Sequence, residues 1–159
     1  MFWNMVRIGI TAWLLLISSY TDLKRRKVYN SITFPAMAAG LILCAATSAI
    51  HLPGRMVSLA VWFFMGALHL MGMGDLKLLM AVCAIWGFRT SLFSLLFGCL
   101  FLAAYSTVMD PKEMKDAVIN VRNFLFYHTP VPTKGRKTYP FAVFLSAGTA
   151  SVLLWEVMA

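Results

Sequence analysis

Six long apolar runs follow one another along the chain, and they limit its possible folds more than any other feature. A helix that crosses the hydrocarbon core of a bilayer needs about 20 predominantly apolar residues. Six such runs use most of the 159 residues, so we expect one domain over 1–159 and no separate soluble domain. We predict an all-α integral membrane protein, a bundle of six transmembrane helices. The predicted spans are 2–20, 32–50, 56–71, 76–88, 91–109 and 141–158.

Composition agrees with this class, because 60% of the residues are hydrophobic and only 13% are charged. Soluble domains carry about 25% charged residues. The first run has something of the shape of a signal peptide, but the basic cluster at 24–27 follows it directly. Such a cluster resists translocation, so we interpret the first run as a membrane anchor.

The formal net charge of +8 is explained by topology. With the basic cluster at 24–27 inside, eleven of the 14 Lys and Arg residues lie on the cytoplasmic side, and Arg7, Arg55 and Arg89 lie outside. This distribution follows the positive-inside rule and places both termini outside. No nucleic-acid partner is therefore expected.

The longest polar stretch is 110–138. It opens with Asp110, Pro111 and Glu113, the pattern of a helix start with Asp at the N-cap and Pro at the first helical position. Apolar residues then recur at helical spacing. We predict an amphipathic cytoplasmic segment on the membrane surface between the fifth and sixth helices.

Asp75 opens the fourth apolar run, with Gly72 and Gly74 just before it, in a chain with only six acidic residues. A charged side chain in the bilayer costs roughly 3 kcal/mol even on insertion scales, so an acid at the membrane boundary indicates a functional site. The glycines let the backbone bend there or approach another element closely.

Asp22 closes the first predicted span, so both Asp22 and Asp75 fall at the cytoplasmic end of the bundle. Two neighbouring carboxyls cannot both ionise easily, so they share a proton and supply a base and an acid together. Such a pair can activate water against a peptide bond. The structural alternative is that Asp22 pairs with Lys24 or Arg25 and that Asp75 caps the fourth helix.

The three cysteines stand singly in apolar runs, without CxxC spacing, and the histidines form no cluster. We therefore expect neither a metal nor another cofactor.

Residues 72–75 resemble the GxGD motif of membrane aspartyl proteases, with Asp75 as its acid. Lys77 follows in the same stretch. We interpret Lys77 as an interfacial anchor rather than a base, because residues two apart on a helix do not share a face.

Residues 22–30 resemble the first aspartate motif of type IV prepilin peptidases, which runs from an Asp through basic residues to an Ile-Pro-Asn ending. Val28 and Tyr29 replace Ile and Pro here, and Asn30 is kept. Pro140, just before the last span, is similar to the proline that precedes the last helix in that family.

This resemblance implies that Asp22 and Asp75 are catalytic and that Gly72, Gly74, Lys77, Asn30 and Pro140 support the motifs. Without CxxC motifs, the chain resembles the short, peptidase-only branch of the tight-adherence (Flp) pilus type. The implied function is that of an aspartic endopeptidase in the inner (cytoplasmic) membrane, which removes a short basic leader from prepilins at the cytoplasmic face. Its substrate would be a single-span prepilin helix, and the oligomeric state stays open.

Two other classes remain as alternatives. A proton-coupled small membrane carrier could also place two carboxylates in a helical bundle, although its transport path would need polar residues through the full thickness. A non-catalytic subunit of a pilus or secretion assembly is the other alternative. It gives no reason for glycines beside Asp75.

Overall fold

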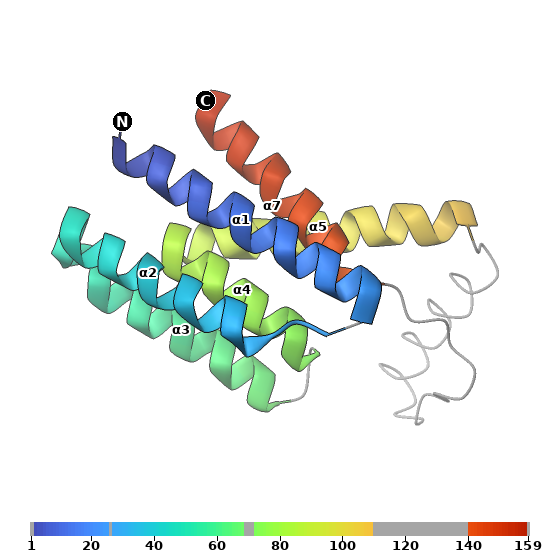
Figure 1. Cartoon of the computed structure of the whole chain (residues 1–159), viewed down its shortest axis with the longest axis horizontal. Helices are drawn as coiled ribbons and strands as arrows, with labels where there is room; N and C mark the ends of the chain where they lie inside the picture. Colours follow the sequence, from blue (N-terminus) through green and yellow to red (C-terminus); the bar gives the residue numbers. More distant parts are fainter. Residues whose placement is uncertain (1, 26, 69–71, 110–139, 159) are drawn as a thin grey trace, which may run out of the picture.

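The computed structural model describes residues 2–25, 27–68, 72–109 and 140–158, and these residues form an all-helical bundle (Figure 1). The prediction of an all-α fold is confirmed for this part of the chain. The predicted amphipathic segment at 110–138 lies outside the described residues. The elements are α1 (Phe2–Arg25), α2 (Asn30–Ser48), the 3-10 turn η1 (Ala49–His51), α3 (Leu52–Ala67), α4 (Met73–Trp86), α5 (Phe88–Met109) and α7 (Phe141–Met158).

Several helix boundaries differ from the prediction. α1 continues to Arg25, past the predicted end at 20, so Asp22 lies inside the helix. Lys24 and Arg25 in its last turn favour this extension, because cations are stabilised at the negative end of the helix dipole. α4 begins at Met73 rather than at 76, which puts Asp75 in its first turn.

The connection between the second and third predicted spans, residues 51–55, is helical in the structure. η1 follows α2 directly, and α3 begins at once at Leu52 with Pro53 in its first positions. Proline is tolerated there because the first turn of a helix has no internal acceptor for its missing N–H.

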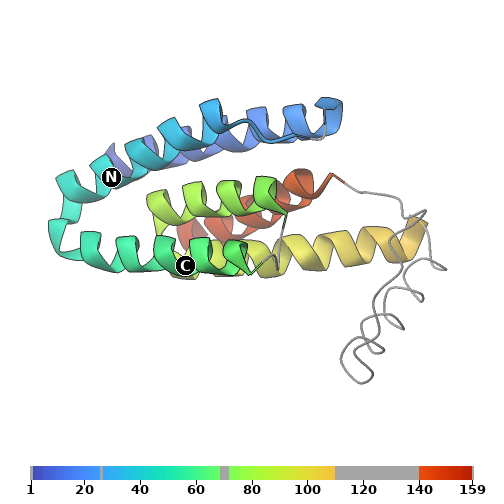
Figure 2. The ribbon, with the colours of Figure 1, turned by 90° about the horizontal axis from the view of Figure 1, so that it is seen from below.

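The helices run antiparallel, so their ends gather in two groups (Figure 1). The C-terminal end of α1 lies with the N-terminal ends of α2, α4 and α7. In Figure 2, α4 lies between α1 and α2 on one side and α3 and α5 on the other. α4 contacts each of the other long helices.

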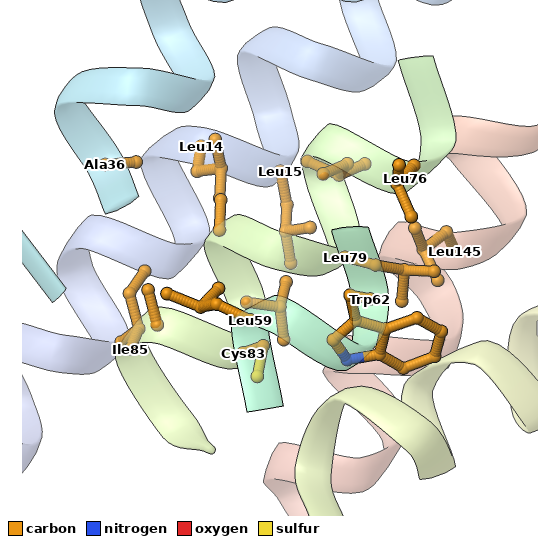
Figure 3. Packing of buried hydrophobic residues seen from close by; sticks show 14 of the residues in the cluster. Leu14, Leu15, Ala36, Leu59, Trp62, Leu76, Leu79, Cys83, Ile85 and Leu145 are labelled. Carbon is orange, nitrogen blue, oxygen red and sulfur yellow. The ribbon is translucent and has the colours of Figure 1, made fainter. Parts of the chain in front are cut away.

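From Leu78 onwards, α4 is apolar on all its faces, as expected for a helix that other helices surround. Leu78, Leu79 and most of the residues up to Ile85 are fully buried. Figure 3 shows Leu79, Cys83 and Ile85 of this helix packed among Leu14 of α1 and Trp62 of α3. The helix that carries Asp75 is therefore the centre of the core.

α5 and α7 cross with their backbones in contact at two glycines. A Cβ built on Gly148 would lie 2.6 Å from the backbone nitrogen of Gly98, closer than any side chain allows. Small residues are used in this way where membrane helices pack closely. Gly87, with φ of 107°, makes the sharp connection between α4 and α5.

Polar contacts tie the helices together at the end opposite to the start of α4. Arg7 of α1 donates to the Thr47 hydroxyl of α2 at 2.6 Å. Arg55 of α3 donates to the Ala84 carbonyl near the C-terminus of α4, also at 2.6 Å. A cation at a helix C-terminus satisfies a carbonyl that has no partner within the helix.

Among the described residues, three helical stretches are long and apolar enough to cross a membrane: Phe2–Arg25, Asn30–Ala67 and Phe88–Met109. The second contains α2, η1 and α3, which fold back on each other (Figure 2). Phe141–Glu156 is a shorter apolar helix. These stretches support a membrane protein.

Candidate active site

A pocket of about 670 Å³ lies where the end of α1 meets the starts of α2, α4 and α7. Asp22 and Asp75 both line it, so the bundle brings the two predicted acids to one place. Its lining residues are Asp22, Lys27, Val28, Tyr29, Asn30, Ser31, Gly74, Asp75, Lys77, Pro140 and Phe141.

Asp22 is 9% exposed and bonds to the first turn of α7. Its Oδ2 accepts a hydrogen bond of 3.1 Å from the backbone N–H of Ala142, 120 residues away in sequence. The first N–H groups of a helix have no acceptor within the helix, and the positive end of the helix dipole favours an anion. This contact therefore fixes one carboxylate oxygen of Asp22 against the start of α7.

The basic residues beside Asp22 contact tyrosines. Lys24 donates to the Tyr20 hydroxyl at 3.5 Å, and Arg25 donates to the Tyr29 hydroxyl at 2.9 Å. Within the part of the chain that is described, Asp22 forms its hydrogen bond with α7 and not with these neighbours. The predicted alternative, a local pair with Lys24 or Arg25, is thus not what the structure contains.

Asp75 is the third residue of α4 and precedes the predicted span at 76–88. Asp75 is half-buried at the pocket, and it lies close enough to Asp22 for the two carboxyl groups to interact electrostatically. Among the described residues, its side chain forms no hydrogen bond. The two carboxyls thus interact electrostatically and have different surroundings.

Gly72 provides space for the carboxylate of Asp75. A Cβ built on Gly72 would lie 3.1 Å from Oδ2 of Asp75. The φ of Gly72 is −61° and its ψ is 135°, a conformation open to any residue. The space at Gly72 therefore serves the Asp75 side chain of the same helix start rather than the predicted close approach to another element, and the predicted backbone bend is not required there.

The remaining motif residues also gather at the pocket. Asn30 begins α2, Pro140 precedes α7, and Gly74 lies beside Val28, which a Cβ on Gly74 would meet at 3.5 Å. Lys77 lines the same pocket as Asp75. Residues two apart on a helix can thus line one pocket without sharing a helix face, and the interpretation of Lys77 as an interfacial anchor stays a prediction.

Sequence reasoning missed some residues of this site. Lys27 and Ser31 line the pocket, and Ala142 contributes its backbone N–H. Ser18 and Ser19, one turn before Asp22, have buried hydroxyls without a hydrogen-bond partner in the described structure. The spacing of four residues between Ser18 and Asp22, which puts both on one face of a helix, was a sequence signal that could have identified Ser18.

No group of three or more His, Cys, Asp and Glu side chains is placed to hold a metal ion within the described ranges. The chemistry available at this pocket is that of two carboxyls, two lysines and hydroxyl and amide groups.

Comparison with known proteins supports the predicted resemblance. The sequence matches the type IV leader peptidase family over residues 9–107, which is more than half of the chain and contains both Asp22 and Asp75. No curated protein and no solved structure matches the chain. The chain belongs to the type IV leader peptidase family.

Proposed function

We propose that this protein is an aspartic endopeptidase that removes the short basic leader from Flp-like type IV prepilins. Family membership supports a leader peptidase. The observation that carries the aspartic mechanism is that Asp22 and Asp75, from separate helices, line one pocket. Cysteines that stand singly, without CxxC motifs, favour the peptidase-only Flp type.

The proposed topology has six spans in one domain over 1–159, formed by α1, α2, α3, α4, α5 and α7. The pocket then lies at the cytoplasmic end of an inner-membrane protein, beside Lys27 and Lys77, and both termini lie outside. α4 has 14 residues and rises only about 20 Å, so it starts below the membrane surface. The polar stretch at 110–138 forms the cytoplasmic segment.

The proposed reaction uses the two carboxyls with one proton between them. The ionised carboxylate takes a proton from water, and the water oxygen attacks the carbonyl carbon of the scissile peptide bond. The protonated carboxyl donates its proton to the carbonyl oxygen. As the C–N bond breaks, the proton taken from water passes to the leaving amine, and the proton on the carbonyl oxygen returns.

The proposed substrate is a single-span prepilin helix with a basic leader. Its apolar helix would lie in the bilayer beside the bundle, which places the peptide bond ahead of that helix at the membrane boundary. The pocket lies at the same level in the proposed topology. The proposed hydrolysis uses only the two carboxyls and water and needs no cofactor.

The test is cleavage of a co-expressed Flp-type prepilin from the same genome, measured by mass. Asp22→Asn and Asp75→Asn should each reduce cleavage by about a thousandfold or more, because the pair acts as a unit. Glu156→Gln is the matched control. It makes the same change at the opposite end of the bundle, where Glu156 accepts a hydrogen bond from Thr90.

Normal cleavage by either Asp variant would show that this Asp is a structural residue and would contradict the mechanism. If the unmodified protein never cleaves the prepilin, the carrier and assembly-subunit alternatives take its place. Proton uptake by reconstituted vesicles then separates these two.

A further inference from the structure

Ser18 differs from the other fully buried hydroxyl residues in the described helices. Its side chain is 0% exposed, and Oγ has no hydrogen-bond partner there. The buried hydroxyls of Thr11, Ser94 and Thr149 each donate to the carbonyl four residues earlier, at 2.7 to 2.8 Å. A buried hydroxyl without a partner costs free energy, so it calls for a role outside its own helix.

Ser18 lies on the same face of α1 as Asp22, one turn earlier. Side chains on a helix lean towards its N-terminus, so the carboxylate of Asp22 leans over the turn that contains Ser18. Ser19, whose Oγ is also buried without a partner in the described structure, lies in that turn too. The turn towards which the Asp22 side chain leans therefore contains two buried hydroxyl groups without partners in the described structure.

One oxygen of this carboxylate already has a donor. Oδ2 of Asp22 accepts from the Ala142 N–H, whereas no donor to Oδ1 is found in the described residues. A carboxylate oxygen has two lone pairs, so Oδ1 can accept from a hydroxyl below and still face the pocket.

We propose that Ser18 is a positioning residue that donates a hydrogen bond to one bridging water, which donates in turn to Asp22, and so holds Asp22 as the ionised base of the pair. Asp75 is then the acid. This inference rests on the proposed peptidase function and deepens it, because it assigns the two roles.

Asp75 has the surroundings that an acid requires. Asp75 lies in the first turn of α4, but its side chain forms no hydrogen bond among the described residues. It is half-buried and lies close to the carboxylate of Asp22, and such a site favours a carboxyl that keeps its proton. Three other titratable groups lie around Asp22 at the pocket: Lys77 of α4, and Lys27 and Tyr29 of the segment before α2. The start of α7 contributes only Pro140 and Phe141, whose side chains do not titrate.

The roles fix where each proton goes. Asp22 takes a proton from water and later gives it to the leaving amine. Asp75 donates to the carbonyl oxygen and regains its proton when the C–N bond breaks. Ser18 touches neither the attacking water nor the substrate in this scheme, so its loss should change the ionisation of the base and leave substrate binding unchanged.

The experiment measures kcat and KM for cleavage of a purified prepilin by the full chain in detergent, between pH 4.5 and 8.5. Ser18→Ala should move the acidic limb of the profile up by about one pH unit and so reduce cleavage about tenfold below that limb, with KM unchanged. Ser18→Thr keeps the hydroxyl and should keep the profile of the unmodified protein. Ser94→Ala is the control, because Ser94 is equally buried but bonded within its own helix.

A Ser18→Ala profile identical to those of Ser94→Ala and the unmodified protein would overturn the proposal. If Ser18→Ala does not accumulate in the membrane, Ser18→Cys replaces it, since a thiol is similar in size and a much weaker donor. Failure of the peptidase function itself is seen separately, as absence of cleavage by the unmodified protein.

Discussion

Replacing Gly72 by alanine should reduce peptidase activity while leaving the bundle folded, because the new methyl group would meet the carboxylate of Asp75. The Cβ would lie 3.1 Å from Oδ2, where ordinary contacts begin at 3.4 Å. The backbone at Gly72 suits alanine, so the helix start is kept and the strain falls on the acid.

The magnitude follows from the required shift. The carboxylate must move by about 0.3 Å to restore ordinary contact. A misplacement of 1 Å costs about a hundredfold in rate, so a shift of about 0.3 Å corresponds to a loss of roughly fourfold. The loss should appear in kcat, because the acid serves the chemical step more than substrate binding.

The assay is steady-state cleavage of a prepilin, together with thermal unfolding in the same detergent. Gly54→Ala is the matched control. Gly54 also lies in the first turn of a helix, α3, and a Cβ there would meet nothing within 4 Å. Equal activity of Gly72→Ala, Gly54→Ala and the unmodified protein would refute the idea that Gly72 makes room for Asp75.

Three more predictions follow from the same structure. The kcat/KM for cleavage should fall about tenfold per pH unit on the alkaline side of its profile, because the pair of carboxyls there loses the one proton that the reaction needs. A profile that stays flat over the whole range from pH 4.5 to 8.5 would contradict this. Gly148→Ala should lower the free energy of unfolding by about 1–3 kcal/mol, since its methyl group would press on the backbone of Gly98. An unchanged unfolding midpoint would contradict this, because it would show that α5 and α7 can move apart to accommodate the methyl group without a loss of stability. Arg55→Gln should destabilise the fold by about 0.5–1.5 kcal/mol through the weakened contact to the Ala84 carbonyl, and prepilin cleavage at a temperature where the variant is folded should stay normal.

Much of the helical architecture could be predicted from the apolar runs. The sixth predicted span, 141–158, coincides with α7, and α1 and α5 differ from their predictions at one end only. These runs carry a local signal, because every spanning helix must present apolar side chains to lipid or to other helices. Where a span was misjudged, as at the start of α4, glycine and a charge hid the beginning of the helix.

The neighbours of each helix could not be predicted in the same way. The central position of α4 and the contact from Asp22 to Ala142 join residues far apart in sequence, and no local spacing encodes them. The acids themselves were visible because charge is rare in this chain. The hydroxyls beneath Asp22 were not, because serine is common in membrane helices and its burial depends on packing.

The hydrogen bond between Asp22 and α7 has a consequence for biosynthesis. A ribosome delivers α1 to the membrane early, whereas the start of α7 emerges 120 residues later. Until α7 docks, the carboxylate of Asp22 lacks its backbone donor and the pocket lacks the wall formed by Pro140 and Phe141. If the proposed mechanism holds, a nascent chain that already contains both acids is expected to be inactive until α7 is inserted and packed.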